Sequence, residues 1–225
     1  MYQIKGILFD MDGTVLSSEG LFEKAQKKYL REKKIIVNSE ELYVFKGLSY
    51  KDFYPQFIEK FNITDDIDLI RKKIRNHLYS LMETDLEYIE GFKSFYKNVI
   101  KNSNIKVALV TNTTRESYQK IQTIVNIDKY FNYTITVSEA KKPKPNPDPY
   151  LQAMKKLKLK PNNTMIIEDS KTGLLSALKT KSKVVGITTT MKEEEIKSLN
   201  ENIEIVNSYP KLEKIFKEKF YYISG

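Results

Sequence analysis

The sequence predicts an α/β fold in which a parallel sheet carries helices on both faces and an all-helical domain is inserted after the first strand. From Phe92 onward, short apolar runs alternate with amphipathic stretches, a pattern typical of a parallel sheet covered on both faces. The stretch 18–86 differs, because it contains helical patterns and no convincing strand. With 225 residues, of which 40% are hydrophobic and 12% aromatic, the chain is long and apolar enough to bury such a core.

The first strand is expected at Ile4–Phe9, a short apolar run that ends at an acidic residue. Five further apolar runs predict the other strands: Val107–Val110, Thr134–Val137, Met165–Ile167, Val184–Ile187 and Ile203–Val206. Helical patterns separate or follow them at Glu116–Val125, Tyr150–Leu157, Gly173–Lys179, Glu193–Leu199 and Lys211–Phe220. Residues 1–16 and 88–225 are therefore expected to form one core.

Residues 17–87 are expected to form the inserted helical domain, with hinges at 16–20 and 87–91. Ser18, Ser39 and Thr64 are expected to cap its first, second and fourth helices. Ser49 with Asp52 resembles a capping box for a third helix, at 52–61. The fourth helix would have one apolar face, made by Ile67, Ile70, Ile74, Leu78 and Leu81. An insertion at this point places a lid over the carboxyl end of the first strand, where ligands bind in open α/β sheets.

Composition excludes several classes of function. The sequence has no Cys, which excludes disulfides, thiolate metal ligands and a Cys nucleophile. No apolar run approaches the ~20 residues that span a bilayer, and the N-terminus does not resemble a signal peptide, so a cytoplasmic protein without a membrane partner is expected. The net charge is +9, but only four of the 38 basic residues are Arg, and the Lys residues are interleaved with Glu. Specific nucleic-acid binding is therefore not expected, whereas attraction of anionic substrates is, and a monomer is the expected assembly.

The most informative motif is Asp10-Met11-Asp12-Gly13-Thr14, which follows the first strand directly. Carboxylates at i and i+2 of an extended segment point the same way and repel each other at neutral pH. A divalent cation is the obvious counter-charge. Gly13 permits a sharp turn, and Thr14 adds a hydroxyl beside the pair. The motif therefore predicts a metal site at the end of this strand.

Three further polar motifs follow predicted strands, and the carboxyl ends of parallel strands meet at one edge of a sheet. They are Thr111-Asn112, the run Lys144-Pro145-Asn146-Pro147-Asp148-Pro149-Tyr150, and Glu168-Asp169-Ser170. Lys141 and Lys142 are rivals of Lys144, because Lys142-Pro143 imitates the start of the same run. The spacing back from Tyr150 favours Lys144 and leaves Lys142 as the alternative.

Together the four motifs resemble those of the haloacid dehalogenase-like superfamily of aspartate-nucleophile phosphatases, and the resemblance covers nearly the whole chain. The fourth motif here is Glu168-Asp169-Ser170-Lys171-Thr172-Gly173. The inserted helices resemble the cap of the β-phosphoglucomutase-like and phosphoglycolate phosphatase-like branch. In that branch a cap loop reaches into the active site, and its counterpart here makes Lys46, Gly47 and Ser49 candidate specificity residues. The resemblance implies a Rossmann-like core.

The resemblance also implies a Mg²⁺-dependent phosphatase that hydrolyses a small phosphorylated metabolite through an aspartyl phosphate on Asp10. Asp12 would be the acid–base residue, protonating the leaving oxygen and later deprotonating the attacking water. Thr111, Asn112 and Lys144 would bind the phosphate. The implied Mg²⁺ ligands are Asp10, Asp169, Glu168 and the main-chain carbonyl of Asp12.

Alternative functions differ in how well the motifs agree with them. A phosphomutase of the β-phosphoglucomutase type stays an alternative, although Phe22 stands where those enzymes carry His and Tyr50 where their cap loop carries Arg. The presence of Asp12 argues against dehalogenation. Phosphonate hydrolysis would need a Lys in the cap, for which Lys46 and Lys51 are candidates. The alternative from another class is a basic binding protein with a vestigial site, and the complete set of motif residues speaks against it.

Overall fold

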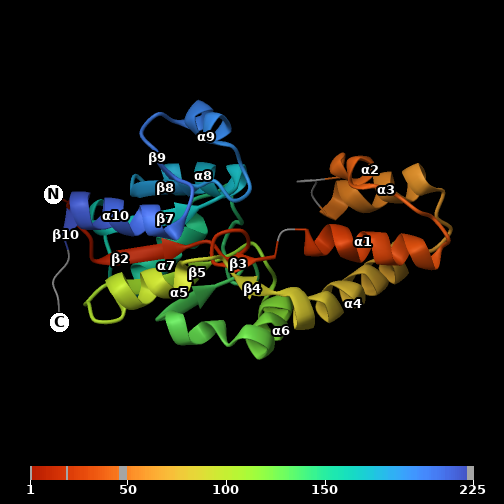
Figure 1. Cartoon of the computed structure of the whole chain (residues 1–225), viewed down its shortest axis with the longest axis horizontal. Coiled ribbons are helices and arrows are strands. Elements are labelled where there is room, and N and C mark those ends of the chain that lie inside the picture. The colour runs from red at the N-terminus through yellow and green to blue at the C-terminus, as the bar shows by residue number, and fades with distance from the viewer. Residues whose placement is uncertain (1, 19, 46–49, 222–225) are drawn as a thin grey trace. The chain divides into compact units, whose positions relative to one another are not determined.

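The computed structural model describes residues 2–18, 20–45 and 50–221 (Figure 1). The chain divides into two compact units. One unit joins Met1–Ser17 to Glu87–Gly225, and the other is Ser18–Leu86. The role of the helical unit as a lid stays a prediction. None of the helices within the described ranges combines the length and the apolar character that a membrane span requires.

The first unit is built on a six-stranded sheet, and the predicted α/β class with a parallel sheet is confirmed. Its strands are β2 Gly6–Phe9, β5 Lys106–Val110, β6 Tyr133–Ile135, β7 Thr164–Glu168, β8 Lys183–Ile187 and β9 Glu204–Val206. They follow the order β6-β5-β2-β7-β8-β9, and every neighbouring pair is parallel. Each predicted strand is present, with ends displaced by one or two residues. Because β2 lies between β5 and β7, the residue that follows β2 is central on the carboxyl edge.

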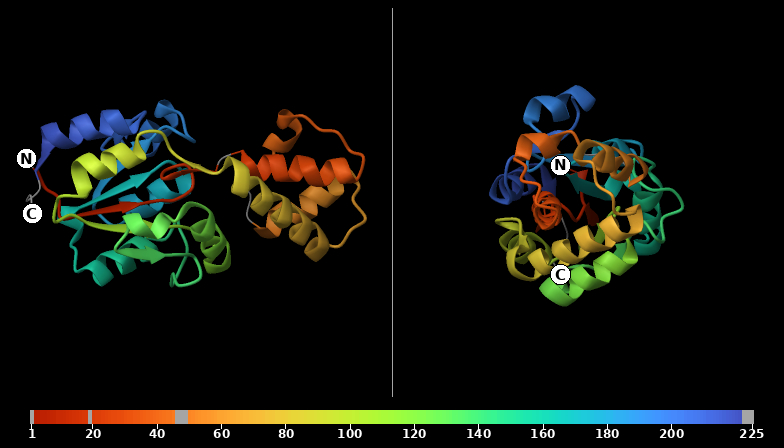
Figure 2. Two further views of the ribbon diagram at one scale, coloured as in Figure 1. Left: turned by 60° about the horizontal axis from the view of Figure 1, so that its bottom comes forward. Right: turned by 90° about the vertical axis from the view of Figure 1, so that its right-hand side faces the viewer.

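Helices cover both faces of this sheet. They are α5 Phe92–Phe95 (continued by a π-helix at Tyr96–Ile100), α6 Arg115–Val125, α7 Asp148–Leu157, α8 Lys171–Leu178, α9 Glu193–Leu199 and α10 Tyr209–Lys219. The five helices predicted for this unit correspond to α6 through α10 within two residues, whereas α5 was not predicted. Figure 2 shows α5 and α10 along one face of the sheet.

The two faces of β2 explain why its sequence is continuously apolar. Leu8 packs in one hydrophobic cluster with Tyr150 of α7 and Leu174 of α8. Phe9 points to the opposite face, where its ring centroid lies 5.8 Å from that of Phe92 in an edge-on arrangement. A strand that is buried on both faces has no polar alternation, so a short apolar run was the correct signal.

Two pairs of two-residue strands were not predicted. β1 Tyr2–Gln3 pairs with β10 Phe220–Tyr221, and β3 Leu16–Ser17 pairs antiparallel with β4 Glu87–Tyr88. Segments of two residues are too short to show a hydrophobic period. The second pair brings together the two chain segments that lead into and out of the helical unit.

The helical unit contains the four predicted helices: α1 Leu21–Glu32, α2 Ser39–Tyr43, α3 Tyr50–Phe61 and α4 Ile67–Asp85. Its core includes Tyr29 of α1, Phe57 of α3, and Ile70 and Ile74 of α4, all of which are buried. The predicted apolar face of α4 is wrong at Ile67, which is 44% exposed because it is the first residue of the helix and precedes the buried turns.

The caps of these helices were predicted at the wrong residues. α1 begins after Gly20, in the left-handed region at φ 79°, rather than at Ser18. α2 is capped by Asn38, one residue before Ser39, in a capping box with Glu41. α4 is capped by Asp66, two residues after Thr64. The apolar period places a helix only to within one or two residues, so it does not decide between neighbouring polar residues. Ser49 lies outside the described residues.

The cap of α4 can be tested with a pair of variants. Asp66 Oδ1 accepts a hydrogen bond of 2.9 Å from the backbone N–H of Leu69. We expect Asp66→Ala to lower the free energy of unfolding of the helical unit by about 1 kcal/mol. Thr64→Ala removes an exposed side chain and should change it by less than about 0.5 kcal/mol. Urea unfolding followed by circular dichroism measures both, and an equal loss in the two variants would contradict the assignment.

Candidate active site

Asp10 is the first residue after β2, and its backbone N–H donates to Ile167 O on the neighbouring strand β7 at 3.0 Å. The residue as a whole is 8% exposed. Burial raises the pKa of Asp10 well above its usual value, and the nearby Glu168 and Asp169 raise it further, while Lys144 acts in the opposite direction. Further positive charge beside Asp10 would oppose this shift and favour the ionised carboxyl.

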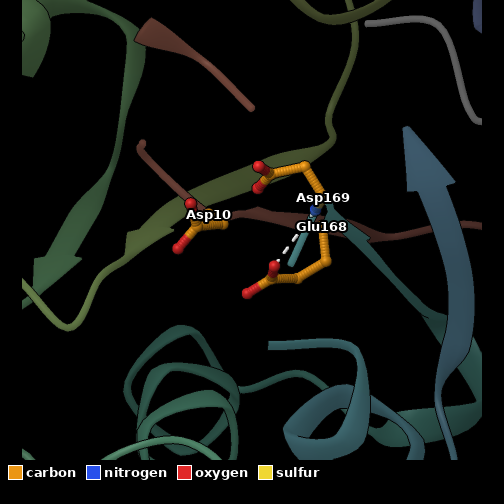
Figure 3. A group of neighbouring side chains, drawn as sticks. All are labelled: Asp10, Glu168 and Asp169. Atoms are coloured by element: carbon orange, nitrogen blue, oxygen red, sulfur yellow. Dashed lines mark hydrogen bonds between the residues drawn. The ribbon is translucent and has the colours of Figure 1, made fainter. Parts of the chain in front are cut away.

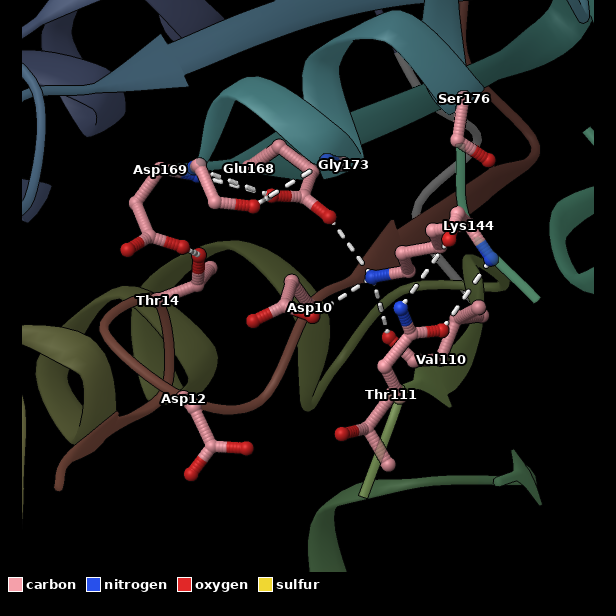
Figure 4. A network of polar contacts seen from close by, with 12 residues as sticks. Asp10, Asp12, Thr14, Val110, Thr111, Lys144, Glu168, Asp169, Gly173 and Ser176 are labelled. Carbon is pink, nitrogen blue, oxygen red and sulfur yellow. Dashed lines mark hydrogen bonds and ion pairs between the residues drawn. The ribbon is translucent and has the colours of Figure 1, made fainter. Parts of the chain in front are cut away.

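Lys144 is the cation at the centre of the site. Its Nζ donates to Asp10 Oδ1 at 2.6 Å, to Glu168 Oε1 at 2.7 Å and to the carbonyl oxygen of Val110 at 2.8 Å, so all three N–H groups are used (Figure 4). Burial alone would lower the pKa of Lys144, but the two carboxylates outweigh burial and hold it above its usual value. Lys141 and Lys142, the rivals of Lys144 in the sequence, are exposed.

Glu168 is the last residue of β7 and is fully buried. Besides Lys144, its carboxylate accepts hydrogen bonds from the Tyr150 hydroxyl at 2.8 Å, from the backbone N–H groups of Asp169 and Ser170, and from the Ser170 hydroxyl. Burial first, and then the negative charge of Glu168, raise the pKa of Tyr150 well above its usual value, so that the phenol stays a donor. Glu168 therefore ties together Lys144, α7 and the start of α8.

Asp169 is held by two threonine hydroxyls from different loops. Thr14 Oγ1 donates to Oδ1 at 2.9 Å, and Thr190 Oγ1, in the loop after β8, donates to Oδ2. Gly13 lies against the same carboxylate, at φ +80°, and a Cβ there would come within 2.1 Å of Oδ2. Thr189 Oγ1 also donates to the carbonyl oxygen of Gly13 at 2.5 Å. The loop after β8 thus fixes both Asp169 and the turn that follows Asp10.

Asp10, Glu168 and Asp169 form a group that could hold a metal ion. Each offers a carboxylate oxygen, these oxygens lie within 4.8 Å of one another, and all three residues are buried (Figure 3). A hard divalent cation prefers oxygen ligands of this kind. Among the residues that the structure describes, Lys144 is the cation bonded to this group of three buried carboxylates, so the charge balance also fits a bound divalent cation.

The turn after β5 carries three polar residues with separate tasks. Thr111 is buried, and its Oγ1 accepts a hydrogen bond of 2.9 Å from the backbone N–H of Thr113. The side-chain amide of Asn112 pairs with the main chain of Lys144, donating to its carbonyl oxygen at 3.3 Å and accepting from its N–H at 3.2 Å. Thr113 Oγ1 donates to Asp12 Oδ2 at 2.9 Å. The side chain of Asn112 is therefore occupied in positioning Lys144.

The structure brings most of the predicted site residues to one edge of the sheet: Asp10, Asp12, Thr111, Asn112, Lys144, Glu168 and Asp169 (Figure 4). Lys46, Gly47 and Ser49 lie outside the described residues. Sequence reasoning missed Thr113, the hydroxyl of Tyr150 as a partner of Glu168, and the loop with Thr189 and Thr190. That loop follows the predicted strand 184–187, so the rule that found the other motifs could have found it as well.

Known proteins resemble this chain in sequence and in fold. The family model of haloacid dehalogenase-like hydrolases matches residues 7–187. The chain is 26% identical over 176 residues to a phosphorylated carbohydrates phosphatase of Thermotoga maritima, covering 77% of this chain and 80% of that protein. It is 24% identical over 192 residues to the pyrophosphatase PpaX of Oceanobacillus iheyensis, covering 84% and 86%. A crystal structure from Thermotoga maritima, provisionally described as a β-phosphoglucomutase, shares the fold with a TM-score of 0.86 at 20% identity, over 96% of this chain and all of that one.

The packing of α8 against Glu168 predicts whether Gly173→Ala raises or lowers the free energy of unfolding. Ala in place of Gly within a helix usually stabilises by about 1 kcal/mol. At Gly173, however, a Cβ would lie 1.7 Å from Glu168 Oε1, and it would displace a buried carboxylate from its partners. We expect Gly173→Ala to lower the free energy of unfolding by about 1–3 kcal/mol. Thr172→Ala, an exposed neighbour in the same helical turn, should be neutral or slightly stabilising. Thermal unfolding measures both, and a stabilised Gly173→Ala variant would contradict the packing.

Proposed function

The chain belongs to the haloacid dehalogenase-like hydrolases, and from this premise we propose that it is a Mg²⁺-dependent phosphatase acting on a small phosphorylated metabolite. The observation that carries the proposal is the buried network in which Lys144 bonds to both Asp10 and Glu168, with Asp169 beside them. This arrangement offers a nucleophilic carboxylate, a fixed cation and a metal-binding group at one edge of the sheet.

In the proposed reaction a carboxylate oxygen of Asp10 attacks phosphorus and the bond from phosphorus to the leaving oxygen breaks. Asp12 gives its proton to that leaving oxygen, and the first product departs. A water molecule then attacks the phosphorus of the aspartyl phosphate and transfers a proton to Asp12. Inorganic phosphate leaves, Asp10 is regenerated as a carboxylate, and Asp12 is protonated again. The intermediate divides one difficult displacement into two easier steps.

Asp10 and Asp169 are the side-chain metal ligands that we propose first, together with the main-chain carbonyl of Asp12. Glu168 belongs to the same acidic group, but its oxygens already accept five hydrogen bonds, so it would ligate a metal only if one of them were given up. When bound, Mg²⁺ would supply positive charge to the Asp10 carboxylate and to the phosphoryl oxygens. Positive charge from the metal would lower the raised pKa of Asp10 and so favour the ionised carboxylate that a nucleophile requires.

The phosphoryl group would be held mainly by charge and by one hydroxyl. Lys144 already uses its three N–H groups, so it acts on a phosphate as a fixed positive charge unless it exchanges an acceptor. Thr111 Oγ1 accepts a hydrogen bond from Thr113, which leaves its own hydrogen to donate to a phosphoryl oxygen. We therefore propose Thr111 as the direct contact, and Asn112 as the residue that positions Lys144.

The proposed substrate class is a small phosphorylated metabolite. The names of the two relatives direct the first assays to phosphorylated carbohydrates and to pyrophosphate. Nucleotides, phosphoglycolate and glycerol phosphate complete a panel in which released inorganic phosphate is measured. The net charge of +9 favours encounters with any of these anions.

The nucleophile is tested by Asp10→Asn. This nearly isosteric change removes the attacking carboxylate, and we expect it to lower phosphate release at least ~10³-fold. Acid-quenched wild-type protein, after reaction with a radiolabelled phosphate ester, should carry protein-bound phosphate that hydroxylamine releases, and the variant should carry none. Phosphate release by a correctly folded Asp10→Asn variant at the wild-type rate would rule out the mechanism.

The metal site is tested through Thr190. Phosphate release should require Mg²⁺ and stop when a chelator removes it. Thr190→Val loses the hydroxyl that donates to Asp169, so we expect its Mg²⁺ affinity, measured by calorimetry, to fall about 10-fold or more. Thr188→Val is the matched control in the same loop, because the structure gives the Thr188 hydroxyl no hydrogen bond to any described residue. Turnover without metal, or equal Mg²⁺ affinity in the two variants, would argue against the site.

A further inference from the structure

Thr113 joins two loops that are distant in the sequence. It lies in the turn after β5, and its Oγ1 donates to Asp12 Oδ2, in the turn after β2, at 2.9 Å. The Thr113 side of this bond is well anchored. Its backbone N–H donates to Thr111 Oγ1 at 2.9 Å, and its carbonyl oxygen accepts from the N–H of Val137 at 3.2 Å. As a β-branched residue, Thr113 also has restricted rotation about χ1.

We propose that Thr113 is a positioning residue for Asp12, and that it helps to set the orientation in which that carboxyl exchanges a proton with the leaving group and with water. This inference rests on the proposed function, in which Asp12 is the acid–base residue. The terminal torsion of an Asp side chain is broad, so an unheld carboxyl group rotates and its oxygens exchange places. A directed hydrogen bond to Oδ2 limits that rotation. Proton transfer in the transition state depends on such placement, because the donor and the acceptor must be within hydrogen-bond reach.

The same turn supplies the proposed phosphate contact. Thr111 and Thr113 are two residues apart and are linked by the hydrogen bond between the Thr113 N–H and Thr111 Oγ1. The group that receives a phosphoryl oxygen and the group that orients the proton donor are therefore held at a fixed spacing. A shift of the turn after β5 would displace the hydroxyls of both Thr111 and Thr113. The position of the phosphate and the orientation of Asp12 would therefore change together.

The test uses two substrates that differ in their need for a proton. An alkyl phosphate such as glycerol phosphate has a poor leaving group that must be protonated, whereas p-nitrophenolate leaves without a proton. With Thr113→Val we expect kcat on the alkyl phosphate to fall at least ~10-fold. On p-nitrophenyl phosphate the first step should be nearly unchanged, but water attack still needs Asp12. A burst of nitrophenolate, equal to the enzyme concentration, should therefore precede a slow steady state.

Two further variants separate positioning from a general structural effect. Thr113→Ser keeps the hydroxyl and should restore both the alkyl phosphate rate and the burst-free time course. Thr114→Val disturbs the neighbouring residue, whose Oγ1 caps α6 by accepting from the Ser117 N–H, and should lower stability without producing a burst. The melting temperature of each variant shows the structural cost independently of the kinetics.

Several results would overturn the inference. If Thr113→Val releases nitrophenolate without a burst and loses as much activity on p-nitrophenyl phosphate as on the alkyl phosphate, the substitution disturbs the site in general. Wild-type kinetics in that variant, or no recovery in Thr113→Ser, would show that the hydroxyl does not position Asp12. None of these results would contradict the proposed phosphatase function, provided that the wild-type protein is active. A wild-type protein that releases no phosphate from any substrate would refute that function and this inference together.

Discussion

The buried ammonium group of Lys144, bonded to Asp10 and Glu168, is the interaction on which the rest of the site depends. Carboxylates that are taken out of water need a partner, and breaking a buried ion pair by removing one member typically costs about 3–5 kcal/mol. Several features of the chain serve to place this one cation: the Val110 carbonyl accepts its third N–H, Asn112 pairs with its main chain, and Tyr150 supports Glu168. The folded network and the proposed chemistry therefore rest on the same contacts.

The parallel sheet explains why residues so far apart in the sequence can share this network. β2, β5, β7 and β8 occupy four adjacent positions of the sheet, in the order β5-β2-β7-β8, and all four end at the same edge. Their exits supply Asp10, Thr111, Asp169 and Thr190 respectively. The strands are buried on both faces, which fixes their ends. The polar turns that follow are therefore held in place by a rigid sheet. Lys144 reaches the centre from the segment that precedes α7, and Ser176 of α8 fixes that segment by donating to the Asn146 carbonyl oxygen at 2.5 Å.

Much of this arrangement could be predicted from the sequence, because its signals are local. The apolar runs gave the six strands, and polar residues directly after them gave Asp10, Thr111 and Asp169. The choice of Lys144 over Lys142 needed the spacing back from Tyr150, and burial of Lys144 in the structure agrees with it. Other features have no local signal. The partners of a hydroxyl such as that of Thr190 depend on which loop folds against it, and the pairing of Asn112 with the main chain of Lys144 depends on a loop 32 residues away.

Asp10 and Asp12, the two carboxylates of the motif after β2, have different hydrogen-bond partners, and this difference suits the two proposed roles. Asp10 lies among charges, where the ammonium of Lys144 opposes the effects of burial and of Glu168 and Asp169. A nucleophile in such a setting would benefit from further positive charge, which favours its ionised form. The carboxylate of Asp12 accepts, among its interactions, a hydrogen bond from the hydroxyl of Thr113. A hydroxyl can keep this hydrogen bond while the carboxyl group takes part in proton transfer. The turn at Gly13 and the loop after β5 thus give these two residues different hydrogen-bond partners, Lys144 for Asp10 and Thr113 for Asp12, and this difference supports the two proposed roles.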